Sequence, residues 1–182
     1  MQRIVTPEAF VNAFHPLVVE KRKKIRQLFY ARKQYTALFL NNEDGILART
    51  AKSLGLGFRR EFLNIDAVFA VEGVDSFPAA IEHEHDGETS TEEMTNLANV
   101  SIPLKVLITY PGPPGPSEDQ LLRRYEGIIR TSEMRNEPAQ HQGYLVIFAF
   151  DEGGRITWRY HAYPSARFDS LPIPGTAVGP YA

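Results

Sequence analysis

The chain of 182 residues contains no cysteine. This absence excludes disulfide bonds, thiolate zinc sites and cysteine nucleophiles together. Any metal ion that the protein binds must therefore be held by oxygen or imidazole ligands. The sequence also lacks a phosphate-binding loop, a dinucleotide-binding glycine pattern, a G-x-S-x-G nucleophile elbow and an H-E-x-x-H zinc motif, so the function classes that these motifs mark are not indicated.

Long apolar runs are absent as well. No segment approaches the length that crosses a bilayer, and the N-terminus does not have the charged-then-apolar layout of a secretory signal. We therefore expect no membrane association and a cytoplasmic location. With 43% hydrophobic and 23% charged residues, the composition is that of an ordinary globular protein, and the length suits a single domain that spans residues 1–182.

The chain has little net charge, but its charges are segregated. The formal net charge of -2 gives no overall attraction to nucleic acid or to an anionic membrane. Seven cations and no acid lie between Lys21 and Lys33, whereas six acids and no lysine or arginine lie between Glu82 and Glu93. This segregation indicates a basic surface beside an acidic site, although a solvated basic helix face is the commoner explanation of such a run.

The pattern of apolar residues predicts helices in the first third of the chain. Thr6 followed by Pro7 marks a helix start, and apolar residues at helical spacing continue to about Tyr30. Residues 35–40 are ambiguous, and a second helical pattern covers residues 46–54, closed by glycine. Residues 1–57 should therefore form a helical N-terminal part.

From residue 58 the periodicity predicts strands alternating with helices. The expected elements are the strands "FRREF", "IDAVFAV" and "AAIEH", a helix over 88–100, the buried strand "PLKVLITY", a helix over 117–131, and a hairpin of "GYLVIFAF" and "ITWRYHAY". The tail, residues 164–182, is rich in proline and glycine and is expected to be irregular. The fold class that follows is α/β, with a central mixed sheet flanked by helices and a C-terminal β-hairpin.

The stretch "AAIEHEHDGE" carries the most unusual chemistry in the sequence. In a strand, alternate side chains face opposite sides, so Glu82 and Glu84 share one face and His83 and His85 share the other. Asp66 precedes Glu82 by 82 − 66 = 16 residues, which is enough for a strand, a turn and a return strand. A hairpin of this length is expected to bring Asp66 opposite Glu82 or Glu84.

An aspartate at the start of one strand and Glu-x-Glu on the next, followed by a helix and a buried strand, resembles the PD-(D/E)XK nuclease superfamily, also called restriction-endonuclease-like. The resemblance covers residues 58–110 and implies a restriction-endonuclease-like core. By position it implies that Asp66, Glu82 and Glu84 hold Mg²⁺ or Mn²⁺ and act in catalysis. Glu84 stands where lysine is most common, and Ile65 replaces the usual proline. The resemblance therefore leaves Lys105, on the next strand, as a migrated catalytic lysine.

The activity implied by the resemblance is metal-assisted hydrolysis of phosphodiester bonds in nucleic acid, with DNA as the expected substrate. The basic segment would then contact phosphates through Lys21, Lys23, Lys24 and Arg26. Because the chain has little room for a separate recognition domain, sequence-specific cleavage would require a homodimer. Glu20 on the first helix is a further candidate acid, although a surface glutamate is the simpler interpretation.

Three alternatives remain open from the sequence. In the first alternative, the chain is a catalytically inactive nuclease-fold module that binds nucleic acid or protein through its basic helix. A second alternative is a His-x-His transition-metal protein built on His83 and His85. The third is that "EHEHDGE" is only the solvated, polar end of a strand.

Overall fold

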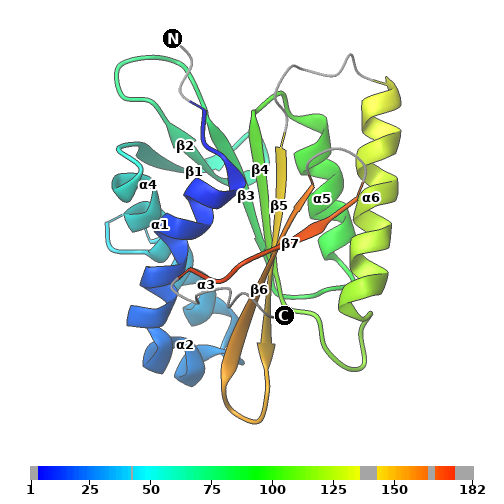
Figure 1. The fold of residues 1–182 in the computed structure, drawn as a ribbon. Coiled ribbons are helices and arrows are strands. Elements are labelled where there is room, and N and C mark those ends of the chain that lie inside the picture. Colours follow the sequence, from blue (N-terminus) through cyan, green and yellow to red (C-terminus); the bar gives the residue numbers. More distant parts are fainter. Residues whose placement is uncertain (1–3, 42, 136–142, 164–166, 175–182) are drawn as a thin grey trace, which may run out of the picture.

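The structure is a computed structural model that describes residues 4–41, 43–135, 143–163 and 167–174. In chain order its elements are α1 (Pro7–Glu20), α2 (Arg22–Leu28), α3 (Arg32–Leu40), α4 (Ile46–Ser53), β1 (Gly57–Phe62), β2 (Ile65–Ala70), β3 (Ala79–Glu84), α5 (Ser90–Asn99), β4 (Leu104–Thr109), α6 (Glu118–Arg135), β5 (Gly143–Asp151), β6 (Ile156–Tyr163) and β7 (Asp169–Leu171). The described residues form an α/β fold with one mixed seven-stranded sheet flanked by helices (Figure 1). This confirms the fold class that the sequence predicts.

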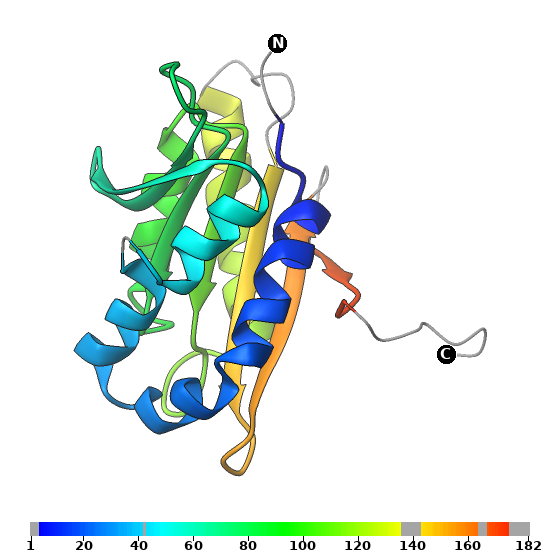
Figure 2. The same ribbon diagram turned by 90° about the vertical axis from the view of Figure 1, so that its left-hand side faces the viewer.

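The strands lie side by side in the order in which they occur in the chain. β3, β4 and β5 are parallel, and every other neighbouring pair is antiparallel. The two parallel connections advance in the same direction across the sheet, so crossovers of the usual right hand place α5 and α6 on one face. Helices α1 to α4 cover the opposite face (Figures 1 and 2).

Two hydrophobic clusters fill the spaces on either side of the sheet. One joins α1–α4 to side chains such as Ala79, Ile81 and Ile108, and the other joins α5 and α6 to side chains such as Ala80 and Leu107. All six residues of β4 are buried, as expected for a parallel strand that is covered on both faces. The alternation of β3 between the two clusters decides which face each residue of "EHE" reaches.

The start of the first helix is as predicted. Pro7 is its first residue, and the side chain of Thr6 accepts a hydrogen bond from the backbone N–H of Ala9 at 3.2 Å. The helical pattern up to Tyr30, however, is divided into two helices, because the backbone leaves the helical region at Lys21, with ψ of 6°. Four consecutive cations follow Glu20, and like charges three and four residues apart destabilise a continuous helix.

Most of the later elements confirm the sequence prediction, with two differences. The ambiguous residues 35–40 belong to α3, whose Tyr35 and Phe39 are buried in the core. The tail is not wholly irregular, because Asp169–Leu171 pairs with β6 as the edge strand β7. Residues 164–166 and 175–182 of the predicted tail lie outside the described residues. None of the described helices is both long and apolar enough to cross a membrane.

A buried hydrogen bond joins α5 to α6 and generates the first prediction. The Tyr125 hydroxyl bonds to Ser90 Oγ, and both residues are fully buried. In Tyr125→Phe, Ser90 keeps its bond to the carbonyl of Gly87 but loses this partner. We expect a loss of about 1 kcal/mol in the free energy of unfolding, measured by urea titration. Tyr30→Phe, at an exposed tyrosine, is the control, and an equal loss in the two variants would contradict the prediction.

Candidate functional site

Asp66 and Glu82 face each other across the antiparallel pair β2–β3. The register that pairs Ala67 with Ile81 continues to place Asp66 opposite Glu82. Two reciprocal hydrogen bonds hold the pair: the backbone N–H of Asp66 donates to Glu82 Oε2 at 3.1 Å, and the backbone N–H of His83 donates to Asp66 Oδ2 at 2.9 Å. The hairpin therefore brings these two acids together as the sequence predicted.

Glu82 is buried among other acids. Its side chain belongs to the face covered by α5 and is only 2% exposed, and Oε1 is buried without a hydrogen-bond partner among the described residues. Burial, followed by the negative charges of Glu93 and Asp66, raises the pKa of Glu82 to about 9. The proton that Glu82 takes up can form a hydrogen bond to the carboxylate of Glu93. The two acidic side chains can therefore lie close together without repelling each other as two negative charges.

Asp66 and Glu84 complete the acidic group at its more open side. Burial raises the pKa of Asp66, and the charge of Glu84 adds to this effect, while the hydrogen bond from the His83 backbone opposes it. Glu84 is only partly buried, and its Oε1 accepts a hydrogen bond from the backbone N–H of Asp86 at 2.8 Å. Its carboxylate thus shapes the start of the loop that leads to α5.

The acidic group includes one residue that the sequence analysis did not assign. Glu93 lies in the first turn of α5, where carboxylates are favoured by the helix dipole. It is the last acid of the run that starts at Glu82, so the only signal was the charge segregation itself. Sequence spacing does not reveal that the helix following β3 turns back over the face that carries Glu82.

Carboxylate oxygens such as those of Asp66 and Glu82 are suitable ligands for a hard divalent ion, but they do not form a complete metal site by themselves. No three histidine, aspartate or glutamate side chains in the described parts of the chain are placed so that together they would hold one metal ion. Mg²⁺, however, commonly uses one or two carboxylates and completes its shell with waters and substrate phosphate. Asp66 and Glu82 suit that mode, because the two backbone hydrogen bonds engage a single oxygen of each carboxylate.

Lys105 points to the same face of the sheet but engages other groups. It is paired with Ala80, one step along β3 from Glu82. Its Nζ donates to the Tyr144 hydroxyl at 3.1 Å and lies 4.7 Å from the centre of that ring. Burial lowers the pKa of Lys105 to about 8, opposed by the charge of Glu133 on α6. The structure therefore gives the predicted catalytic lysine a place between β5 and α6.

The two histidines of "EHEH" lie on the opposite side of the sheet from the acids. The His83 ring stacks on Phe39 at 4.6 Å between centroids, and Nε2 lies 2.7 Å from the Tyr110 hydroxyl. Burial, followed by the charge of His85, lowers the pKa of His83 to about 3. His83 is therefore neutral near pH 7, and its Nδ1 is buried without a hydrogen-bond partner among the described residues.

The remaining candidates separate into two groups. Glu20 forms a two-pronged ion pair with Arg49, with N–O distances of 2.7 and 2.8 Å, and is a surface residue apart from the acidic group. The cations of α2 face solvent: Lys23, Lys24 and Arg26 are exposed, and Lys21 is half-buried. The basic segment is thus an accessible surface on the α1–α4 side.

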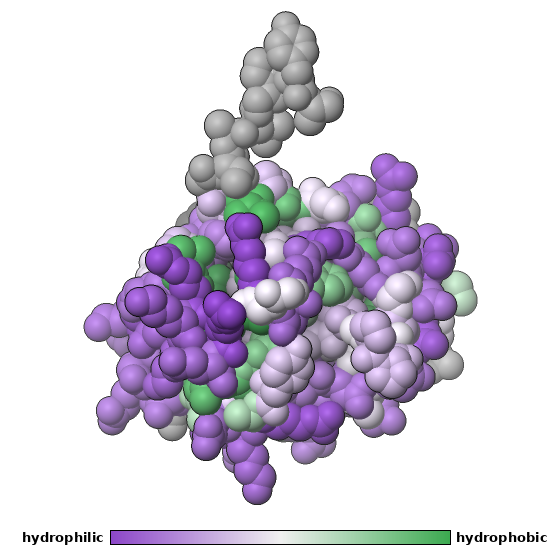
Figure 3. Space-filling view, turned by 90° about the horizontal axis from the view of Figure 1, so that it is seen from below, coloured by the Kyte–Doolittle hydropathy of each residue, from purple (hydrophilic) through white to green (hydrophobic). Residues whose placement is uncertain are grey.

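A cavity of about 770 Å³ lies where the parallel strands end. Its walls come from Tyr110 and the proline-rich loop 111–116, from the loop after Glu84, and from the α2–α3 connection. Ligands of open α/β sheets commonly bind outside the carboxyl ends of the strands. Figure 3 shows this end of the molecule from below, with hydrophilic residues dominant on the side of α1–α3.

The buried position of Glu82 generates a prediction on pH. In the unfolded chain its carboxyl ionises near 4.5, whereas in the folded chain it does so only near pH 9. The folded state therefore holds the extra proton between these values, and the stabilising contribution is lost as the pH rises toward 9. Glu82→Gln should make the free energy of unfolding depend less on pH. At pH 8 it should raise the free energy of unfolding by about 2 kcal/mol.

The measurement is urea unfolding of the wild type and the variant at pH 5, 7 and 9. Glu92→Gln is the matched control, because Glu92 is exposed in the same turn of α5 as Glu93. The same pH slope in the wild type and in Glu82→Gln would show that Glu82 is not the buried acid described here.

Comparisons with known proteins add little to this geometry. No protein-family model matches the chain, and no curated protein matches its sequence. Among solved structures the chain is similar to the central domain of yeast acetyl-CoA carboxylase, with 11% sequence identity and a TM-score of 0.43. The similarity covers 74% of this chain and 27% of that chain. A likeness of this strength carries no argument about function.

Proposed function

We propose that the chain is a divalent-metal-dependent nuclease that hydrolyses phosphodiester bonds, with DNA as the expected substrate. The observation that carries the proposal is the Asp66–Glu82 pair, which lies on one face of β2 and β3 and is fixed by reciprocal hydrogen bonds. Carboxylates are rarely buried without a functional or electrostatic partner. Here burial, followed by the charges of Glu93 and Asp66, raises the pKa of Glu82, and burial raises the pKa of Asp66.

The order of the elements also supports the proposal. A helical part, the antiparallel strands β1–β2–β3, the crossover helix α5 and the parallel strand β4 follow one another. This is the order that the resemblance to PD-(D/E)XK nucleases implies. The acids lie at the matching places, namely at the start of β2 and near the end of β3.

In this proposal Asp66 and Glu82 hold Mg²⁺ or Mn²⁺, and Glu84 stands at the entrance. The bound ion would supply Lewis-acid polarisation of the phosphate and lower the pKa of an attacking water. The backbone N–H groups of Asp66 and His83 fix the orientation of the two carboxylates. Met94 and Leu97 of α5 are buried on this face and limit the access of bulk water, so a scissile phosphate would approach from the side of Asp66 and Glu84.

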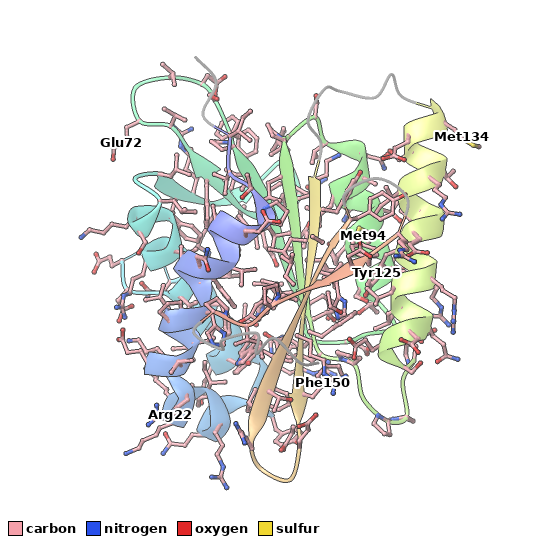
Figure 4. All side chains as sticks on the ribbon, viewed as in Figure 1. Arg22, Glu72, Met94, Tyr125, Met134 and Phe150 are labelled. Atoms are coloured by element: carbon pink, nitrogen blue, oxygen red, sulfur yellow. The ribbon has the colours of Figure 1, made fainter. Side chains whose placement is uncertain are left out.

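The test is divalent-dependent cleavage of supercoiled plasmid and of single-stranded DNA. Asp66→Asn keeps the size of the side chain but removes its charge, so it should lower the cleavage rate by about a hundredfold or more. Glu72→Gln is the matched control, because Glu72 is an exposed acid in the turn at the far end of the same strand pair (Figure 4). Equal rates in the two variants, or cleavage that persists in EDTA, would refute the proposal.

A second function, nucleic-acid binding without catalysis, is favoured by the exposure of the α2 cations. Arg22, Lys23, Lys24 and Arg26 are all exposed, as phosphate-contacting residues must be. Lys23→Ala combined with Lys24→Ala should weaken binding to duplex DNA and make the slope of log K against log salt shallower by about two units.

Fluorescence anisotropy of a labelled duplex at several salt concentrations measures both quantities. The matched control is Lys52→Ala with Arg123→Ala, which removes two exposed cations from other helices. Binding that falls equally in both double variants would indicate a general charge effect, and not a surface on α2. If Asp66→Asn binds normally and no cleavage occurs in the wild type, the binding module is the function that remains.

A further inference from the structure

A second cavity, of about 530 Å³, lies between α1, α2 and the β5–β6 hairpin. Four cations contribute to its walls and no aspartate or glutamate does: Arg22, Lys23, Arg26 and Arg155. In Figures 1 and 2 α2 lies beside this hairpin, and Figure 4 shows Arg22 at the same lower end of the molecule. The cavity therefore combines segments that are about 130 residues apart in the chain.

The cations around this cavity are not neutralised by neighbouring acids. Among the described residues, none of the four forms an ion pair within 4.0 Å. The charge of Arg26 is felt by Asp151, but that carboxylate already accepts hydrogen bonds from the Tyr30 hydroxyl and the Gly154 N–H. Four like charges around one space repel one another, and an anion bound among them would relieve this repulsion.

One cation of the cavity lies against the backbone of the β5–β6 hairpin. Thr157 also borders the cavity, but its side chain lies on the other face of β6 from those of Ile156 and Trp158. The guanidinium of Arg26 lies against Gly154, so close that an added Cβ would be 2.9 Å from Nη2. Because Gly154 also has φ of +83°, only glycine readily allows this approach. Arg26 is thus positioned by the backbone of the hairpin.

Apart from His15 on α1, the side chains that form the remaining walls are apolar. Val18, Ile25 and Trp158 are buried beside the cavity, while Val19 and Ile173 are 42% and 37% exposed. A bare inorganic ion would leave this apolar surface uncovered. A ligand with an anionic group and a flat or apolar body would cover both parts.

We propose that this cavity binds a nucleoside monophosphate, either as a free nucleotide or as the 5′-phosphorylated end of a nucleic-acid strand. Arginine guanidinium groups match the oxygens of a phosphate in pairs, and a phosphate monoester carries nearly two negative charges. The sugar and base would cover Val19 and Ile173. The choice of a nucleoside as the apolar body rests on the proposed function, but the site lies on the opposite side of the sheet from Asp66 and Glu82.

Trp158 provides a direct signal, because it is the single tryptophan of the chain and lines this cavity. The experiment is a titration of the full chain, in EDTA, with adenosine 5′-monophosphate, adenosine and inorganic phosphate, followed by tryptophan fluorescence. A saturable change with the monophosphate, weaker with phosphate and absent with adenosine, is expected. No saturable change with the monophosphate at millimolar concentration, or an equal one with adenosine, would overturn the proposal.

Two variants and a control assign the signal to the cavity. Arg26→Gln and Arg155→Gln should each weaken binding of the monophosphate by about tenfold, because each removes a charge-assisted hydrogen bond. Lys52→Gln removes one exposed cation from α4, outside the cavity lining, and it should bind within about twofold of the wild type. Equal weakening in all three variants would contradict a built site.

A labelled oligonucleotide with or without a 5′-phosphate distinguishes the two sources of the ligand. Preference for the phosphorylated strand assigns the cavity to strand ends, and binding of the free monophosphate alone assigns it to nucleotides. Equal binding of both oligonucleotides, weakened by Lys52→Gln as much as by Arg26→Gln, would overturn the proposal in favour of general backbone contact. Because no metal or cleavage is involved, this result is independent of the Asp66→Asn test.

Discussion

The burial of acids at the end of β3 is the constraint on which the candidate site depends. Removing a carboxylate from water and surrounding it with like charge is unfavourable by several kcal/mol. The fold tolerates Glu82 because its pKa is raised to about 9, so that the side chain is largely protonated at neutral pH. Two backbone N–H groups, one on each strand, donate hydrogen bonds to the carboxylates of the Asp66–Glu82 pair.

The rest of the sheet compensates for this local cost. β3, β4 and β5 are covered on both faces, and two large hydrophobic clusters are built on them. The same arrangement separates the chemistry of "EHEH" into two environments. Glu82 reaches the α5 side and meets other acids, whereas His83 reaches the opposite side and meets Phe39 and Tyr110. One residue of offset along a strand therefore decides between a charged site and an aromatic core.

Local patterns were sufficient to predict the parts of this arrangement that depend on period and spacing. The interval from Asp66 to Glu82 fits two strands and the connection between them, so their pairing followed from the alternation of two strands. Glu93 did not follow, because its place depends on how α5 packs across the sheet. The sequence placed Lys105 on the next strand, but its Nζ donates to Tyr144 on β5, a strand that begins after a connection of more than thirty residues.

The helical part was less predictable for a related reason. Residues 7–30 carry a nearly continuous helical pattern, and only the backbone at Lys21 interrupts it. Residues 35–40 have no clear period of their own and become helical where Tyr35 and Phe39 enter the core. For residues 35–40 tertiary packing determined the outcome, whereas the break at Lys21 coincides with the local run of like charges.

The separation of charge by the sheet limits how the protein can use its two kinds of surface. The acids face the α5–α6 layer, whereas the cations of α2 and Arg155 surround a cavity on the side of α1 and α2. A single phosphate group cannot contact both, because the sheet with its buried side chains lies between them. A nucleic acid that used both surfaces would have to pass around the end of the molecule where β3, β4 and β5 terminate. The larger cavity and the proline-rich loop lie at that end, so its shape, more than the number of basic residues, would limit which strands reach the acids.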